Sequence, residues 1–300
     1  MKLSIITINY NDAAGLKKTL DSVAMQTCAN FEHIIVDGAS TDGSVDIICQ
    51  YADSQDIRRQ GNEAKRQVAW LSEPDTGIYN AMNKGIEIAL GKRIVNSLNR
   101  SELVEDKNKG IRMASGEYLL FLNSGDVLVD ENVVYDFIAS DRIEDIVAGG
   151  TLLGVDERLP KYPPKVLTYE LFVTDSLMHA ATFIRRELFE QYGLYNEQHR
   201  IVSDWEFFVK VLVNNNCTYT TIDRLISLFD TTGISNQSSH STLHEQERRE
   251  VIDRYMPRLI PVYDELVEKR RICEEYQFLK NGRLGWVIKL CLKLKSMKKK

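Results

Sequence analysis

The fold is decided by the stretch LSIITINYND at residues 3–12, an apolar run that ends in Asn-Tyr-Asn-Asp. Such a run predicts a buried strand that leads into a polar loop. Leu16, Leu20 and Val23 then recur at helical spacing and predict a helix that ends near Gln26-Thr27. A buried strand followed by an amphipathic helix is the unit from which parallel sheets are built.

The same order of strand, loop and helix recurs further along the chain. We expect strands at 32–36, 68–71 and 118–122, and helices over 44–52 and from Ile78 onward. Strands that alternate with helices predict an α/β fold, with a Rossmann-like, mostly parallel sheet flanked by helices. Ligands of such sheets bind at the carboxyl ends of the strands. Polar loops follow the predicted strands at Asn9, Asp37, Glu73 and Asp126, so we expect them to share one edge.

The second half of the sequence is less regular. We expect a strand over 180–184, a helix over 204–213, and a pair of strands at 218–222 and 225–229. The stretch 231–243 is rich in Thr, Ser, Asn and Gly and predicts a mobile loop. From His244 the chain is charged and is expected to be helical.

Composition and charge exclude several classes of protein. The net charge is −5, so the chain as a whole has no electrostatic case for binding nucleic acid. The five cysteines are scattered and form no Cys-x-x-Cys pair, which argues against a zinc site and a disulfide framework. The apolar run at the start is too short for a signal peptide, and no run of apolar residues is long enough to span a membrane. Reduced thiols in a cytoplasm fit best.

The last residues differ from the rest of the chain in charge. After Glu275 the charged residues are all basic, and apolar residues that include Trp286 lie between them. A basic segment of this kind predicts an interfacial helix on anionic lipid, which would attach the protein to the inner face of the membrane. The alternative is a helix packed on the domain with a solvated lysine end.

Four ordered blocks of sequence carry a resemblance to a known family. The blocks lie at 5–11, 34–44, 72–85 and 116–126, and a later acidic block follows at 201–208. In this order they resemble the family-2 inverting glycosyltransferases, which have the GT-A fold. The resemblance covers about 3–99 and 110–212.

The resemblance implies a nucleotide site for a UDP-type donor in the first half. It assigns Asp37 to the base or ribose, with Thr7 and Asn9 beside it, and adds Asp75 and Asn83. A carboxylate just beyond a buried strand can accept hydrogen bonds from a base imide or from ribose hydroxyls. For Asp37 the alternative is a cap on the next helix, and for Asp75 it is a Pro-Asp-Thr-Gly turn.

The resemblance also implies a divalent cation, Mn²⁺ or Mg²⁺, held by Asp126. Such an ion neutralises the diphosphate charge that is left when the bond to the sugar breaks. The family's acidic signature is usually Asp-x-Asp-Asp, whereas this chain has Asn-Ser-Gly-Asp at 123–126. Only the last acid is present, and the alternative for Asp126 is a turn residue after a strand.

An inverting transferase needs a base for the attacking hydroxyl, and the resemblance assigns this role to Asp204. Glu206 is the second candidate, and a helix-start acid is the alternative for Asp204. His179 begins a block found on the acceptor side, where it would contact phosphate or acceptor unless it is a core histidine. His240, in the predicted loop, would close on the diphosphate.

Taken together, these features predict a GT-A domain at 1–231, with a donor half at about 1–126 and an acceptor half at about 127–231. Residues 232–300 form a mobile loop and a helical, basic extension. The expected activity is hexosyl or N-acetylhexosaminyl transfer to a glycan or lipid-linked saccharide, in bacterial surface polysaccharide synthesis. The sequence is compatible with a homodimer and does not determine the oligomeric state. The rival interpretation is a non-catalytic nucleotide-binding scaffold or partner subunit, supported by the depleted acidic signature and by the near-repeat of 83–91 at 108–116.

Overall fold

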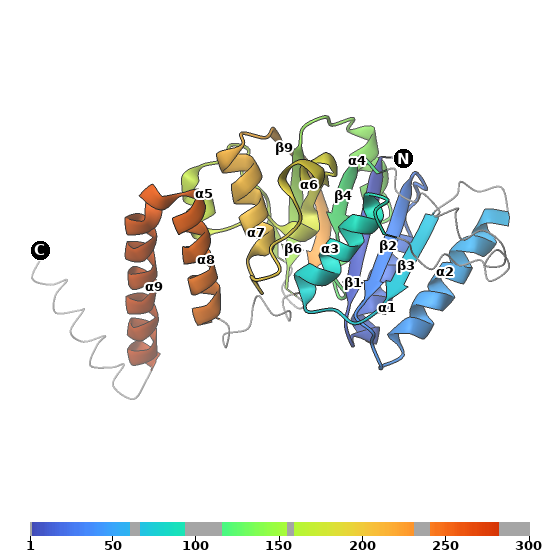
Figure 1. The fold of residues 1–300 in the computed structure, drawn as a ribbon, viewed down its shortest axis with the longest axis horizontal. Coiled ribbons are helices and arrows are strands. Elements are labelled where there is room, and N and C mark those ends of the chain that lie inside the picture. Colours follow the sequence, from blue (N-terminus) through green and yellow to red (C-terminus); the bar gives the residue numbers. More distant parts are fainter. Residues whose placement is uncertain (1, 61–66, 94–115, 155–158, 231–240, 282–300) are drawn as a thin grey trace, which may run out of the picture. The chain divides into compact units, whose positions relative to one another are not determined.

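The structure, a computed structural model, describes residues 2–60, 67–93, 116–154, 159–230 and 241–281. The chain divides into two compact units, Met1–Ser241 and Thr242–Lys300 (Figure 1). The first unit is built on a mixed sheet with the strand order β3-β2-β1-β4-β8-β6-β9-β5, with β7 paired to β6. The α/β fold with a mostly parallel N-terminal sheet therefore agrees with the sequence.

The first four strands of this order are parallel. They are β1 (Leu3–Asn9), β2 (Phe31–Asp37), β3 (Gln67–Ser72) and β4 (Tyr118–Phe121). All residues of β1, β2 and β4 are buried, as the continuous apolar runs indicate. The register pairs Asn9 with Asp37 and Asp37 with Ser72, so these strand ends meet at one edge.

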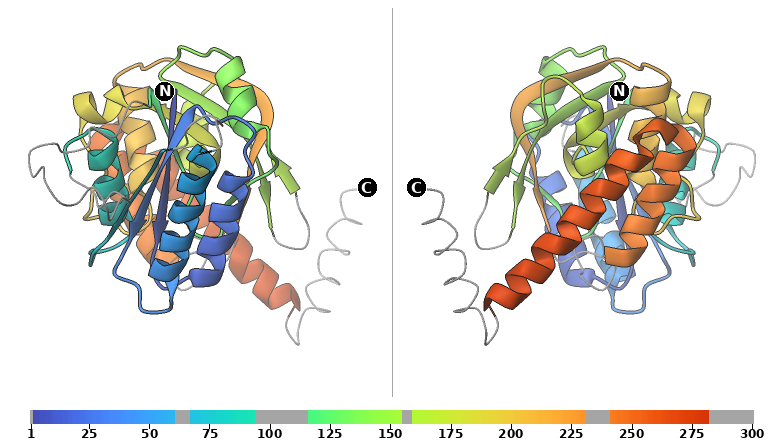
Figure 2. Two further views of the ribbon diagram at one scale, coloured as in Figure 1. Left: turned by 90° about the vertical axis from the view of Figure 1, so that its right-hand side faces the viewer. Right: turned by 90° about the vertical axis from the view of Figure 1, so that its left-hand side faces the viewer.

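Helices cover both faces of the parallel strands (Figure 2). Helices α1 (Ala13–Ala24) and α2 (Ser44–Gln60) lie on one face, where Leu16, Leu20 and Ile35 belong to one apolar cluster. Helix α3 (Ile78–Ala89) lies on the other face. A Cβ added at Gly85 would come within 2.6 Å of the Ile6 side chain, so a glycine allows α3 to pack close to β1.

The second half of the sheet is mixed. It contains β5 (Val127–Leu128), β6 (Ile146–Leu153), β7 (Leu159–Lys161), β8 (Thr182–Arg185) and β9 (Tyr219–Phe229). The predicted strand pair at 218–222 and 225–229 is wrong, because β9 is a single strand that pairs parallel with β6 across a register irregularity near Gly150. The strand expected at 180–184 begins later, since a 3-10 turn occupies His179–Ala181.

Short helices complete the first unit. They are α4 (Val133–Ala139), α5 (Tyr169–Thr174), α6 (Glu187–Tyr192) and α7 (Ser203–Phe208). Helix α7 continues into a π-helical stretch at Val209–Asn214, so the segment expected to be helical at 204–213 is helical throughout.

The described part of the second unit contains the helices α8 (Ser241–Tyr255) and α9 (Ile260–Asn281), joined by the 3-10 turn Pro257–Leu259. The Tyr263 hydroxyl donates to the Glu245 carbonyl at 3.0 Å, and Arg249 pairs with Asp264. Because α8 begins at Ser241, the loop expected at 231–243 is wrong for its last three residues. In the described parts of the chain, no helix is both long enough and apolar enough to cross a membrane.

Three features singled out in the sequence lie outside the described residues. They are the second copy of the repeat (108–115), the loop that contains His240 (231–240), and the basic C-terminal segment (282–300).

Candidate active site

The carboxylate of Asp37 joins three strand ends at the carboxyl edge of the sheet. Its Oδ1 accepts from Asn9 Nδ2 at 2.8 Å and from the Ser40 hydroxyl at 2.6 Å. Its Oδ2 accepts from Ser72 Oγ at 2.7 Å and from the Ser40 N–H at 2.9 Å. The side chain is 0% exposed, and these bonds fill its ordinary acceptor capacity. Asp37 therefore shapes the edge, and its assignment to the nucleotide stays a prediction.

Asn9 and Thr7, which were assigned beside Asp37, lie in different surroundings. Asn9 contacts Asp37 and also accepts from Ser124 Oγ at 2.8 Å, which ties β1 to the turn after β4. The buried Thr7 hydroxyl instead lies 2.9 Å from His33 Nε2, whose other ring nitrogen is 2.9 Å from a hydroxyl of α2. The structure thus brings Asn9 to Asp37 and directs Thr7 into the layer between sheet and helix.

Two side chains flank the backbone of Gly38 on the accessible side of this edge. A Cβ at Gly38 would lie 2.4 Å from Asp75 Oδ2 and 3.0 Å from Tyr10 Cδ2. Tyr10 is 67% exposed, and the other Asp75 oxygen accepts from the Gly77 N–H at 2.9 Å. Tyr10 was missed in the sequence, although an aromatic residue directly after the first strand end is a signal that could have identified it.

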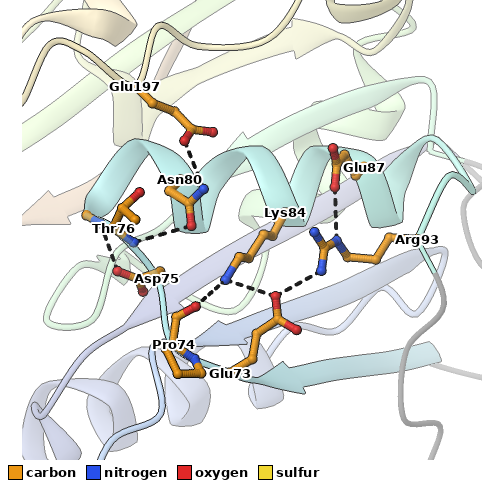
Figure 3. A network of polar contacts seen from close by, with 10 residues as sticks. Glu73, Pro74, Asp75, Thr76, Asn80, Lys84, Glu87, Arg93 and Glu197 are labelled. Carbon is orange, nitrogen blue, oxygen red and sulfur yellow. Dashed lines mark hydrogen bonds and ion pairs between the residues drawn. The ribbon is translucent and has the colours of Figure 1, made fainter.

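The loop that carries Asp75 is fixed by a buried lysine (Figure 3). Lys84 of α3 is 8% exposed, and its Nζ lies 2.9 Å from Glu73 Oε1 and 2.7 Å from the Pro74 carbonyl. Arg93 also contacts Glu73, at 2.9 Å. The hydrogen bond from Lys84, together with the charges of Lys84 and Arg93, lowers the pKa of Glu73. The loop therefore holds an ionised, paired glutamate next to Asp75.

The opposite side of α3 contacts the segment 195–197. Asn83 Nδ2 donates to the Tyr195 carbonyl at 2.9 Å, and its Oδ1 accepts from the Tyr195 N–H at 2.9 Å. Asn83 and Asn80 each donate to a carboxylate oxygen of Glu197 (Figure 3 shows the Asn80 contact). Asn83 is buried, and its amide hydrogen-bonds to the Tyr195 backbone and to Glu197. Its assignment to the nucleotide stays a prediction.

Helix α3 also contacts Asp204, through Tyr79. The Tyr79 hydroxyl lies 2.8 Å from Asp204 Oδ1 and 2.7 Å from the Ile201 carbonyl. Burial, and then the charge of Asp204, raises the pKa of Tyr79 well above its usual value, so the hydroxyl keeps its proton. Asp204 is partly exposed at the start of α7, whereas Tyr79 is buried. A carboxylate that is fixed on one side and accessible on the other can accept a proton.

Glu206 and His179 face other neighbours. Glu206 is buried, and its Oε2 lies 2.8 Å from His199 Nδ1 and 3.1 Å from Asn196 Nδ2. His179 contacts the Tyr195 hydroxyl at 2.8 Å and stacks on Phe121, with ring centroids 4.6 Å apart. Burial lowers the pKa of His179, and the charge of Asp204 opposes this shift. His179 is thus a neutral ring near Asp204.

Asp126 follows β4 in a tight turn and is 3% exposed. Its Oδ1 accepts from the Asp230 N–H at 3.0 Å and its Oδ2 from the Asn123 N–H at 3.3 Å. Burial raises the pKa of Asp126 to about 7, since the two backbone bonds only partly offset it and the Asp230 carboxylate repels it. Asp230 was missed in the sequence, because nothing local links the end of β9 to this turn.

Among the described residues there is no group of three or more His, Cys, Asp or Glu side chains that could hold a metal ion. An amide oxygen is available near Asp126, however. Asn123 Oδ1 is buried and accepts no hydrogen bond from the described residues, and it lies in the same turn as Asp126. An orphaned amide oxygen beside a buried carboxylate fits the oxygen ligands that Mn²⁺ and Mg²⁺ take.

Comparison with known proteins shows the family of this chain. Residues 4–97 match the family described as Glycosyl transferase family 2. A PGL/p-HBAD biosynthesis glycosyltransferase of Mycobacterium bovis (strain BCG / Pasteur 1173P2) is 30% identical over 214 residues, which is 70% of each chain. An uncharacterized glycosyltransferase of Mycobacterium tuberculosis (strain ATCC 25618 / H37Rv) is 28% identical over 254 residues, 82% of each chain.

Solved structures share the fold. S. aureus TarS 1–349 in complex with UDP-GlcNAc has a TM-score of 0.57 and 20% identity, over 88% of this chain and 66% of that chain. The mannosyltransferase PcManGT from Pyrobaculum calidifontis, in complex with GDP-Man and Mn²⁺, has a TM-score of 0.56 and 14% identity, over 88% and 68%. At these identities the likeness concerns the fold alone.

Proposed function

The chain belongs to glycosyl transferase family 2 and has the GT-A fold, and on this premise we propose that it transfers a sugar from a UDP-sugar to an acceptor hydroxyl with inversion. The proposal rests on the position of the Asp204 carboxylate. This carboxylate is partly exposed, and its Oδ1 is hydrogen-bonded to the Tyr79 hydroxyl. Tyr79 belongs to helix α3, which directly follows the loop with Asp75.

The proposed nucleotide site lies over Gly38. The exposed ring of Tyr10 supplies a face on which a base can stack, and the Asp75 carboxylate can accept from a base N–H or a ribose hydroxyl. The hydrogen bond between Asn9 and Asp37 fixes the strand ends on which this site is built. The choice of UDP is supported by TarS, which was solved with UDP-GlcNAc, and a hexose or N-acetylhexosamine is the sugar we propose.

The proposed chemistry is a direct displacement. The acceptor oxygen forms a bond to the anomeric carbon while the bond from that carbon to the diphosphate oxygen breaks. The hydroxyl proton passes to Asp204, and UDP leaves with the bonding electron pair. Attack from the face opposite the leaving group inverts the anomeric configuration. Because Tyr79 occupies one side of Asp204 Oδ1, the carboxylate is held in position for this proton transfer.

We propose that Asp126 and Asn123 hold a divalent cation, Mn²⁺ or Mg²⁺. The fit rests on the buried Asp126 carboxylate and the unpartnered Asn123 Oδ1. When bound, such an ion supplies positive charge for the diphosphate that leaves. PcManGT, which shares the fold, was solved with Mn²⁺. His179 and His240 stay proposals as phosphate or acceptor contacts, the second from outside the described residues.

The acceptor and the location are also proposals. A relative named for PGL/p-HBAD biosynthesis supports a glycan or lipid-linked acceptor in the synthesis of a cell-surface glycoconjugate. We propose that the domain spans about 1–231 and that the basic segment 282–300 attaches the protein to the cytoplasmic face of an anionic membrane. Removal of 282–300 should then abolish binding to phosphatidylglycerol vesicles and leave UDP binding intact. Unchanged vesicle binding would contradict the attachment.

The activity is tested by release of UDP from UDP-glucose, UDP-galactose and UDP-GlcNAc with Mn²⁺ present. We expect release from at least one of these donors, and the rival scaffold function predicts UDP binding without any release. With a simple glycoside acceptor, the anomeric configuration of the product is read by NMR. A product that retains the donor's configuration would contradict the displacement at Asp204.

A further inference from the structure

The turn after β4 has one acid where its family usually has three, but the fold brings a second acid to it. Strands β5 and β9 pair antiparallel, with Val127 opposite Leu228. This pairing places Asp230, the residue after β9, beside Asp126, and the Asp230 N–H donates to Asp126 Oδ1 at 3.0 Å. The two acids come from positions 104 apart in the chain.

Gly125 makes room for the Asp230 side chain. A Cβ at Gly125 would lie 2.7 Å from Asp230 Oδ2 and 3.3 Å from its Cγ, so any other residue here would push the carboxylate away. Gly125 also has a φ of +97°, which side chains rarely adopt. The position at which the family usually has an acid is therefore a glycine that leaves the space above the turn to an acid from another strand.

The surroundings of the Asp126 carboxylate favour a cation. Asp126 is buried, and the groups that act on it are two backbone N–H donors and the like charge of Asp230. No basic side chain is among these groups. A buried carboxylate without a charge partner is unfavourable, and the unpartnered Asn123 Oδ1 adds a second buried oxygen. One divalent cation would serve all three oxygen donors.

We propose that Asp230 is the second carboxylate ligand of the divalent-cation site, where it takes the place of the acids that are absent from 123–125. This inference rests on the proposed cation at Asp126 and goes beyond it, because the additional ligand comes from the end of β9. Residues from the turn after β4 and from the end of β9 would then hold the ion together.

The test uses the full-length protein and measures Mn²⁺ binding directly, by calorimetry and by the EPR signal of free Mn²⁺, with and without UDP. The variants are Asp230→Asn and Asp126→Asn. The matched control is Asp223→Asn, an exposed acid near the middle of β9. Thermal unfolding in EDTA shows whether each variant is folded.

We expect Asp230→Asn and Asp126→Asn each to weaken Mn²⁺ binding by at least about 10-fold, since even an outer-shell partner contributes that much. Asp223→Asn should bind as the parent does, and all three should unfold cooperatively in EDTA. Should Asp126→Asn weaken binding while Asp230→Asn binds as the parent does, the ligand assigned to β9 is wrong and the cation at Asp126 stands. If neither variant changes Mn²⁺ binding, the cation site itself is wrong.

A second variant separates ligation from a structural role. Gly125→Ala keeps both carboxylates but its methyl group would collide with Asp230 Oδ2. Under the proposal it weakens Mn²⁺ binding in the same direction as Asp230→Asn, beyond any loss of stability in EDTA. Full Mn²⁺ affinity in a folded Gly125→Ala protein would overturn the ligand role of Asp230.

Discussion

Two buried carboxylates at the same sheet edge differ in how they are satisfied. Asp37, at the end of β2, accepts two hydrogen bonds at each oxygen, from side chains and backbone of three segments. Asp126, in the turn after β4, has two backbone N–H donors and an acidic neighbour, and its pKa is raised to about 7. Both carboxylates are almost inaccessible, so burial alone does not distinguish them. They differ in the number and kind of their hydrogen-bond partners.

The comparison extends to the two acids of α7. Glu206 is buried and paired with His199 and Asn196, whereas Asp204 is partly exposed and is held on one side by Tyr79. A carboxylate whose acceptors are filled by the protein contributes to stability. One that retains free acceptor capacity is available for a proton, a cation or a substrate. The following predictions test this division, from the largest expected effect to the smallest.

Asp204→Asn keeps the shape of the side chain and removes its ability to take a proton. We expect UDP-linked transfer to fall by roughly 10²–10⁴, the usual contribution of a general base. UDP affinity should change little, because Asp204 faces the proposed acceptor. Steady-state release of UDP and calorimetric UDP binding measure the two quantities.

Glu206→Gln is the matched control for this prediction. It should lower stability and leave the transfer rate of the folded protein close to that of the parent, since its carboxylate is already paired. Loss of transfer in Glu206→Gln with retention in Asp204→Asn would reverse the assignment of the base.

The free energy of unfolding should depend on pH through Asp126 when no metal is present. Its folded pKa, about 7, lies above the unfolded value of 3.8, so between these values the folded state holds a proton that the unfolded state has lost. Stability contributed by this group is therefore present below about pH 4 and is lost as pH rises to about 7. The loss amounts to roughly 4 kcal/mol at most.

Asp126→Asn should remove this loss. Urea denaturation in EDTA at pH 5 and pH 8 is the measurement. Between these pH values the stability of the variant relative to the parent should rise by roughly 3 kcal/mol at most, which is about two pKa units. If the difference in stability between parent and variant is the same at pH 5 and pH 8, burial does not raise the pKa of Asp126.

Asp37→Asn should destabilise the fold by about 1–3 kcal/mol, because the new NH₂ group faces donors that previously found an acceptor. Ser72 Oγ and the Ser40 N–H both donate to Asp37 Oδ2, so one of them loses its partner. Urea denaturation gives the change. A variant with parental stability and abolished UDP binding would move Asp37 from the structural class to the ligand-binding class.

Tyr79→Phe should have the smallest effect. It removes one hydroxyl that contacts Asp204 and the Ile201 carbonyl, and a hydrogen bond of this kind contributes about 0.5–1.5 kcal/mol. We expect kcat to fall by up to about 10-fold with an unchanged Kd for UDP, because the base loses its orientation. An equal fall in stability with no change in kcat would make Tyr79 a purely structural residue.

The parallel half of the fold was predictable because its signals are local. Continuous apolar runs at 3–8 and 32–36 are strands, and the polar residues after them meet at one edge. The strand pair expected around residues 218–229 was wrong because Asp223 and Arg224 resemble a turn in sequence. In the structure, β9 continues through them next to a register irregularity in its pairing with β6.

The candidate site was predictable in position and less so in detail. A motif identifies which loop lies at the edge, but the direction of a side chain depends on partners far away in sequence. Thr7 contacts His33 and Asn83 contacts the backbone of Tyr195, and neither neighbour is visible from the motif itself. Asp230 was missed for the same reason, since only the pairing of β5 with β9 brings it to Asp126.

Helix α3 has a consequence for the construction of chimaeric enzymes. Its Lys84 holds the loop of Asp75, and its Asn83 and Tyr79 hold the segment 195–204. A crossover between two relatives near residue 126 would combine α3 of one parent with the acceptor segment of the other. Such hybrids should misplace Asp204 even when both parents are active. A recombination scheme that exchanges 78–89 together with 195–204 keeps these contacts within one parent and is the design expected to yield active hybrids.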